Sequence, residues 1–148
     1  MIGRYVSDLQ VGDRLGPIEY TITPFLCREY AHGVEDGWDG YHRAASPDVP
    51  QLLPPTYAHA NKIRVFAHAC PEGAGPVPRI HVEYDATYHR PVHAGMRVRG
   101  TGEVTERYVR NGREWLVCVF ELRDTETGEL MAANRDSSII GTVSAEPA

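Results

Sequence analysis

One stretch, RIHVEYDATYHRPVHAGMRV at residues 79–98, restricts the possible folds of this chain more than any other. Apolar and polar residues alternate over its first half, and this period of two, rich in aromatic and β-branched residues, predicts a half-buried antiparallel strand. Pro91 has no N–H to donate to a neighbouring strand, so it ends or bends this one. The predicted apolar face carries Ile80, Val82, Tyr84, Ala86 and Tyr88, and the predicted polar face carries His81, Glu83, Asp85, Thr87 and His89.

The polar face of this strand carries two imidazoles and two carboxylates. We expect it to meet solvent or a second subunit, with a groove as the alternative. The net charge of -5 argues against a nucleic-acid partner, because phosphate binding needs a basic surface.

The 148 residues are enough for one domain with its own core, predicted to span residues 1–148 with a disordered tail at 142–148. No apolar run approaches the roughly 20 residues of a membrane span, and the N-terminus lacks the apolar segment of a signal peptide. Three isolated cysteines, Cys27, Cys70 and Cys118, lie in apolar surroundings and are predicted to be reduced core thiols. The expected location is therefore cytoplasmic, with no membrane contact.

The order of elements is read from periodicity and punctuation. A strand is predicted over residues 16–22, followed by a helix that Thr23 and Pro24 begin and Gly33 ends. Residues 34–51 have no period and are predicted to be a long, functional loop. A long helix follows from near Thr56 to Cys70, and strands are predicted at 96–108, 114–123 and 129–140.

The long helix decides the fold class. Its predicted apolar side, which an adjoining layer must cover, faces away from Asn61, Arg64 and His68 and consists of Ala60, Ile63, Phe66, Ala67 and Cys70. Consecutive antiparallel strands with one long helix on a face form an α+β architecture. The prediction is a hot-dog fold, an antiparallel sheet wrapped around one long central helix.

Two glycine patterns refine the sheet. Asn111-Gly112 predicts a type I′ hairpin turn, because both residues tolerate positive φ angles. Gly100 and Gly102 inside a strand predict a bulge or the close approach of another backbone.

Three segments of the chain resemble a known family: HVEYDATYHRPVHAGMRV, LLPPTY at residues 52–57, and YAHGVEDGWDGYHRAA at residues 30–45. They are similar to the long strand, the opening of the central helix and the hydratase motif of the MaoC-like dehydratases, in particular the FAS1-like (R)-hydratase type. The resemblance covers about residues 5–141.

The resemblance implies an enzyme, an (R)-specific enoyl-thioester hydratase or 3-hydroxyacyl-thioester dehydratase. Such a hydro-lyase acts on acyl-CoA or acyl-carrier-protein substrates in fatty acid or polyketide metabolism. It uses an Asp/His pair without a cofactor. It works as a homodimer, or as a heterodimer with another hot-dog subunit.

The family motif, roughly Gly-Asp-x-Asn-Pro-Leu-His, assigns the catalytic imidazole to His42. Counting back, Asp39 falls on the motif Asn and Gly37 on the catalytic Asp, so Asp36 is the carboxylate if one residue is inserted. A nearby carboxylate fixes the tautomer of an imidazole and tunes its pKa toward neutrality, which acid–base catalysis needs. Asp36 is the first candidate and Asp39 the second, and a solvated acidic loop is the competing interpretation.

Substrate contacts are expected at the start of the long helix and in the preceding loop. The thioester oxygen needs a hydrogen-bond donor, and the amides around Thr56 and Tyr57 are candidates, because helix N-termini carry unpaired N–H groups. Trp38 and Tyr41 are candidate pocket walls and Asn61 a candidate substrate contact. No spacing of His or Asp matches a metal-ligand set, so no metal is expected.

Two other functions remain open. Some FAS1-like subunits lack the Asp/His pair and only complete the acyl tunnel of a partner, so a non-catalytic partner subunit or binding module is one alternative. The other is a different reaction on the same scaffold, such as a thioesterase, a secondary-metabolite dehydratase or a cyclase, because a fold does not fix a function.

Overall fold

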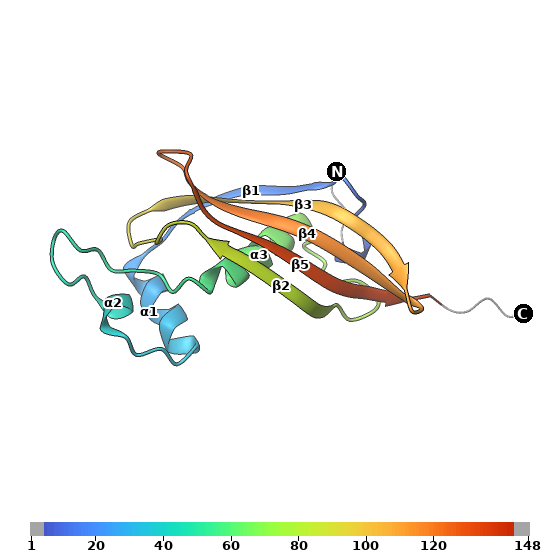
Figure 1. Cartoon of the computed structure of the whole chain (residues 1–148), viewed down its shortest axis with the longest axis horizontal. Coiled ribbons are helices and arrows are strands. Elements are labelled where there is room, and N and C mark those ends of the chain that lie inside the picture. Colours follow the sequence, from blue (N-terminus) through green and yellow to red (C-terminus); the bar gives the residue numbers. More distant parts are fainter. Residues whose placement is uncertain (1–4, 144–148) are drawn as a thin grey trace, which may run out of the picture.

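The computed structural model describes residues 5–143, in which five antiparallel strands form one sheet in the order β1-β3-β4-β5-β2. The sheet arcs over α3, and α1 and α2 gather beyond one end of it (Figure 1). The elements are η1 (Val6–Asp8), β1 (Arg14–Thr21), α1 (Pro24–Gly33), α2 (Asp39–His42), α3 (Tyr57–Ala69), β2 (Ile80–Tyr88), β3 (Arg97–Arg110), β4 (Arg113–Asp124) and β5 (Leu130–Thr142). The predicted arrangement of a sheet wrapped around one helix is confirmed.

Local signals placed most element ends correctly. The Thr23 hydroxyl oxygen accepts the N–H of Leu26 at 3.0 Å, Pro24 is the first residue of α1, and Gly33 is its last. Asn111 and Gly112 have φ angles of 52° and 71°, as the predicted hairpin requires. A disordered tail was predicted to begin at residue 142, but the last strand includes Thr142. Residues 144–148 lie outside the described range.

The predicted faces of β2 are wrong at its beginning. Val82 is an extra residue, because His81 pairs with Ser138 and Glu83 with the adjacent Ser137. Such a bulge shifts the alternation by one residue, so His81 lies on the same side as Tyr84, and both rings contact His59 of α3. As an edge strand, β2 also leaves Ile80 and Val82 about half exposed, at 53% and 44%.

The predicted apolar side of α3 is also wrong. Ile63 is 50% exposed, whereas Asn61 and Lys62 are 1% and 0% exposed. The buried polar residues have distant partners that no helical pattern reveals: the Tyr20 hydroxyl donates to Asn61 Oδ1 at 2.7 Å, and Asp136 lies beside Lys62. The buried side of α3 therefore combines the apolar Val65 and Phe66 with polar residues whose partners lie on distant strands.

The three cysteines are buried and free of disulfides, as predicted for core thiols. Burial raises the pKa of Cys27 and Cys70 to about 11 and that of Cys118 to about 12. None of the helices within residues 5–143 is long and apolar enough to cross a membrane.

The strand glycines permit close packing, but at Gly100 and Gly102 an added Cβ would meet side chains rather than the predicted backbone, and the β3–β4 bulge lies between Val104 and Glu106. A Cβ at Gly16 of β1 would lie 2.8 Å from the carbonyl oxygen of Gly100, and the β1–β3 register shifts at this point. A Cβ at Gly102 would lie 2.7 Å from Cε1 of Phe120, which packs against Phe66 of α3. The glycines therefore allow the curved sheet to close onto the helix.

We predict that Gly102→Ala lowers the free energy of unfolding by about 1–3 kcal/mol, because the added methyl group overpacks the contact with the Phe120 ring. The measurement is urea unfolding. Gly37→Ala is the matched control, because a Cβ there meets no atom within 4 Å, and it should change the stability by less than about 1 kcal/mol. Equal effects of the two substitutions would contradict this account of the core.

Candidate functional site

An apolar cavity of about 290 Å³, here called the slot, lies at the first turn of α3. Its walls come from α2, from the segment that precedes α3, from the end of β2 and from β4 and β5. The slot is lined by residues that include Tyr41, Leu53, Tyr57, Ala58, Tyr88 and Ala132. A concave, mostly apolar cavity with a few polar groups at its edge is the usual form of a small-molecule site.

The Leu52–Pro55 segment shapes one wall because it cannot join the helix. Pro54 and Pro55 delay the start of α3, and Leu53 N–H instead donates to the carbonyl of Val92 at 2.8 Å. Leu52 also forms an isolated β-bridge with His93. This segment is therefore held beside the connection between β2 and β3, and the slot lies between them.

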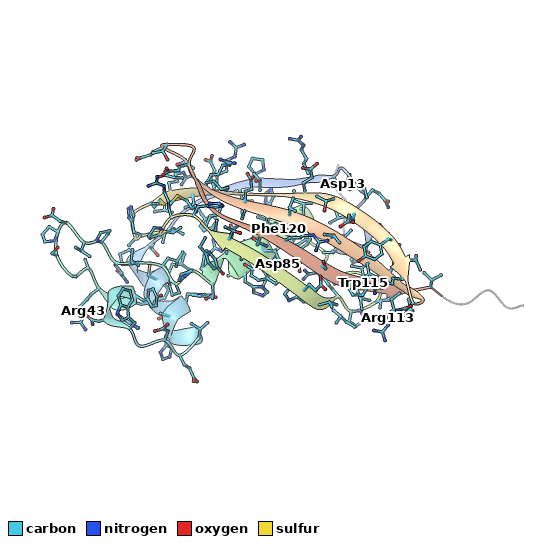
Figure 2. All side chains as sticks on the ribbon, in the orientation of Figure 1. Asp13, Arg43, Asp85, Arg113, Trp115 and Phe120 are labelled. Carbon is cyan, nitrogen blue, oxygen red and sulfur yellow. The ribbon has the colours of Figure 1, made fainter. Side chains whose placement is uncertain are left out.

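Buried Gln51 fixes α2 against the slot. Its side-chain amide donates to the Tyr41 carbonyl at 2.7 Å and to the Pro24 carbonyl at 3.1 Å. The Trp38 and Tyr41 rings meet edge to face at 4.8 Å, and Gly40 leaves room for the Trp38 ring. The region expected to be an irregular loop thus contains a short ordered helix. Arg43 marks its place beyond one end of the sheet, far from Trp115 and Arg113 at the other end (Figure 2).

The structure brings His42 and Asp36 into one turn without pairing their side chains. His42 Nε2 lies 3.1 Å from the backbone oxygen of Asp36. The Asp36 carboxylate instead accepts the N–H of Trp38 at 3.0 Å. His42 is half-buried and Asp36 exposed. The imidazole therefore has a polar neighbour, but that neighbour is a carbonyl group.

Asp39 is engaged elsewhere. Its carboxylate pairs with Arg43 at 2.9 Å, and both side chains are exposed. Burial raises the pKa of Tyr41, and the Asp36 carboxylate adds to this effect. Asp36, rather than Asp39, is thus the acid whose charge acts on a residue that lines the slot.

The N–H groups at the start of α3 are not all free, as the helix N-terminus had suggested. The N–H groups of Tyr57 and Ala58 donate to the carbonyls of Pro54 and Pro55 at 3.0 and 3.2 Å. For the N–H of Thr56, residues 5–143 supply no acceptor. The Thr56 hydroxyl oxygen accepts the Tyr30 hydroxyl at 3.1 Å, which ties α1 to this turn.

The remaining predicted contacts divide between two places. Tyr41 and Tyr57 line the slot, whereas Trp38 lies behind Tyr41 and is 55% exposed. Asn61 lies one turn further along α3, between Tyr20 and Gly100, and does not line the slot. Burial, with Tyr57 nearby, raises the pKa of Tyr20 well above its usual range.

Sequence reasoning named Arg90 as a candidate at the mouth of an acyl tunnel but missed Tyr88 and His89 at the end of β2. Tyr88, His89 and Arg90 lie at the edge of the slot, and Arg90 pairs with Glu129 at 2.7 Å. His89 was expected to meet solvent or a second subunit. The one available signal was Pro91, which ends the strand beside these residues, but the LLPP segment that completes the wall is distant in sequence.

A larger hollow of about 690 Å³ lies on the sheet face opposite α3. Arginine and acidic side chains alternate across it, including Arg14, Asp85 and Arg135. Because several charged side chains line this hollow, the smaller and more apolar slot remains the better candidate for a small-molecule site. Within residues 5–143 no group of three or more His, Cys, Asp or Glu side chains is arranged to hold a metal ion.

No family model and no curated protein matches the chain in sequence. Solved structures do match. A monoamine oxidase regulatory protein from Archaeoglobus fulgidus is 15% identical with a TM-score of 0.75, covering 95% of each chain. The (R)-hydratase PhaJ1 from Pseudomonas aeruginosa is 16% identical with a TM-score of 0.74, covering 98% of this chain and 92% of its own.

The HadBC 3R-hydroxyacyl-ACP dehydratase complex from Mycobacterium tuberculosis contains a third similar chain, 18% identical with a TM-score of 0.69. The match covers 87% of this chain and 96% of that one. This chain has the hot-dog fold of the MaoC-like dehydratases and (R)-hydratases. The predicted fold is confirmed, and at these identities the likeness concerns the fold alone.

We predict that Ala132→Leu weakens binding of a neutral apolar probe such as 1-hexanol by at least about tenfold, because the larger side chain fills the slot. Saturation-transfer NMR measures the affinity. Ala133→Leu is the control, because Ala133 borders the hollow on the opposite sheet face and not the slot. Equal weakening by both substitutions would place the probe elsewhere.

Proposed function

We propose that this hot-dog protein is a hydro-lyase that adds water to a 2-enoyl thioester, or removes it from a 3-hydroxyacyl thioester, carried by coenzyme A or an acyl carrier protein. The observation that carries this proposal is the apolar slot, whose wall residue Tyr41 is followed by the half-buried imidazole of His42. The fold it shares with PhaJ1 and HadBC supports the same class of reaction.

The acyl chain would occupy the slot between Tyr57 and Tyr88, which excludes water from its apolar part. His42 then acts as the general base: it removes a proton from a water molecule as the oxygen bonds to the β-carbon. The protonated His42 then gives this proton to the α-carbon, so the imidazole is neutral again when the addition is complete. Proton transfer by a positioned side chain of this kind typically contributes about 10²–10⁴-fold to a rate.

Asp36 is the proposed acidic partner. It shares a turn with His42, its charge acts on Tyr41, and among residues 5–143 its carboxylate is held by the N–H of Trp38 alone. Asp39 is the weaker candidate because it is paired with Arg43 at the surface. Rotation of the exposed Asp36 side chain is the movement that pairing with His42 requires.

The thioester oxygen becomes more negative during the addition, and the N–H of Thr56 is the proposed donor to it. Among the first amides of α3, those of Tyr57 and Ala58 already have acceptors. Donors aimed at developing charge in a site without water are among the largest catalytic effects.

The decisive measurement is hydration of crotonyl-CoA, followed by loss of the enone absorbance. We predict that His42→Ala and Asp36→Asn each lower kcat/KM by at least about 100-fold. Asp39→Asn should stay close to wild type. His32→Ala is the control for loss of an exposed histidine, because His32 lies at the end of α1.

Equal, low rates for wild type and all variants would contradict the hydro-lyase. They would favour the second candidate, a non-catalytic hot-dog subunit or binding module. A specific observation supports that candidate: His42 lies against a backbone carbonyl, and both nearby acids are exposed. Release of free thiol from saturated acyl-CoA would instead identify a thioesterase. If the protein is inactive in both the hydration and the thiol-release assay, the remaining enzymatic alternative is a tailoring dehydratase or cyclase of a secondary-metabolite pathway.

A second copy, or another hot-dog subunit, is the proposed partner. The HadBC complex joins hot-dog chains. In this chain the edge of β2 carries the exposed apolar side chains Ile80 and Val82. Exposed strand edges pair readily with another chain.

We predict a dimer of twice 16.5 kDa by light scattering, and a shift to the monomer mass in Val82→Lys, because a charged edge residue opposes strand pairing. Val109→Lys is the control, because Val109 is 58% exposed and lies beside the β3–β4 hairpin turn, away from the β2 edge. A monodisperse wild-type monomer would argue against self-association and for a different hot-dog partner.

A further inference from the structure

A row of five side chains, here called the charge row, crosses the hollow on the sheet face opposite α3. The strand registers align its members in the order Asp85 of β2, Arg135 of β5, Val119 of β4, Glu103 of β3 and Arg14 of β1. All five line the hollow. Because β4 is the central strand of the sheet, Val119 lies at the middle of the row.

The charge row is complementary to itself. From β2 to β1 its signs are negative, positive, neutral, negative and positive. A second copy stacked face to face, and related by a two-fold axis along β4, presents the same row in reverse order. Arg14 then faces Asp85 of the second copy, and Glu103 faces its Arg135, with each contact occurring twice. A patch that meets itself in this way is the form that a two-fold interface takes.

Three members of the charge row have no polar partner inside the molecule. Within residues 5–143 the side chains of Arg14, Asp85 and Glu103 make no ion pair or hydrogen bond. Arg135 differs, because Glu106 contacts it at 2.9 Å. Water can solvate exposed charges, so the order of the signs, more than the lack of partners, points to a second copy. The unpaired Arg14 and Asp85 are the residues on which a test can rest.

The hollow as a whole carries no net charge, because its lining contains three arginines and three acids, namely Arg14, Arg99, Arg135, Asp85, Glu103 and Glu121. Two copies of a chain with a net charge of -5 repel one another on average. A neutral face reduces this repulsion where the copies meet. A strongly charged partner gains no net attraction from such a face.

The side chains beside the charge row leave room for a second sheet. Thr87, Ala133 and Thr101 are small and line the same hollow of about 690 Å³. Glu121, close to the proposed axis, is paired with Arg123 at 2.9 Å, so its charge is balanced within each copy. Stacked sheets cross at about 30°, which displaces facing residues on strands two places from the axis by about 5 Å. An arginine side chain is long enough to span this displacement.

We infer that the hollow is a contact between two copies of this chain, stacked through their sheet faces, with Arg14 of each copy paired to Asp85 of the other. Pairing along the β2 edge would extend the sheet in its plane, whereas this contact lies perpendicular to the plane, so one molecule can use both. Exposed ion pairs are weak and are screened by salt. The face contact is therefore the weaker of the two, and it joins edge-paired dimers into tetramers at high protein concentration and low ionic strength.

The test is sedimentation equilibrium of Val82→Lys, because this substitution opposes pairing along the β2 edge and leaves the face as the contact to be measured. We expect this variant to dimerise in about 20 mM NaCl, and about 0.5 M NaCl should raise the dissociation constant at least about tenfold.

Exchange of the charges identifies the contact. In the Val82→Lys background, Arg14→Asp or Asp85→Arg alone should weaken dimerisation at least about tenfold, because each places like charges opposite one another. The two substitutions together should restore dimerisation. Arg14 and Asp85 lie on opposite edge strands with three strands between them, so they cannot meet within one copy, and restoration requires a contact between copies.

Arg110→Asp is the control for the change in net charge. It reverses an exposed charge next to the β3–β4 turn and away from the hollow, and it should change the dissociation constant by less than about threefold.

The inference fails if Val82→Lys stays monomeric at about 1 mM protein in low salt, which would assign the hollow to a different partner. It also fails if the single charge reversals have no effect, or if the double exchange does not restore dimerisation, since either result would place the contact elsewhere. The salt titration needs no substitution in the hollow, so it stands even if a charge variant does not fold. The assay involves neither His42 nor a thioester, so its outcome is independent of the proposed hydro-lyase activity.

Discussion

The burial of α3 against the curved sheet is the interaction on which the rest of the molecule depends. Three contacts along the helix attach it to different strands: Asn61 accepts the Tyr20 hydroxyl of β1, Lys62 lies beside Asp136 of β5, and Phe66 meets Phe120 of β4 edge to face at 5.0 Å. Glycines on β3 remove the side chains that would otherwise hold the sheet away. Close packing of this kind fixes the helix in one position, since interiors tolerate little change in volume.

With α3 fixed in this position, its first turn and its middle lie in different chemical environments. The first turn borders an apolar slot, because Pro54 and Pro55 keep the preceding residues out of the helix. The middle of the helix carries Asn61 and Lys62 into the interior. Hydrogen bonds offset the cost of burying Asn61, whereas the charge of Lys62 is only partly compensated by Asp136 at 3.6 Å.

The proposed catalytic segment depends on side-chain tethers more than on secondary structure. The four residues of α2 are too few for a self-supporting helix. Gln51 holds this segment through the carbonyls of Pro24 and Tyr41, and Trp38 packs over Gly40 onto Tyr41. These tethers hold His42 directly after Tyr41, which lines the slot, while Asp36 lies at the surface.

The sequence by itself determined most of the elements, because caps, prolines and hairpin turns act over a few residues. Thr23 and Gly33 bound α1, and Asn111-Gly112 forms the turn between β3 and β4. The sequence also identified Tyr41 and Tyr57, which line the slot. Only the tertiary structure decided which side of α3 is buried, which way His81 points, and that Tyr88 and the LLPP segment share a wall. Each of these depends on partners distant in the chain, such as Asp136 for Lys62, or on one extra residue at Val82. Local patterns contain no information about such partners, so they emerge only when the sheet closes on the helix.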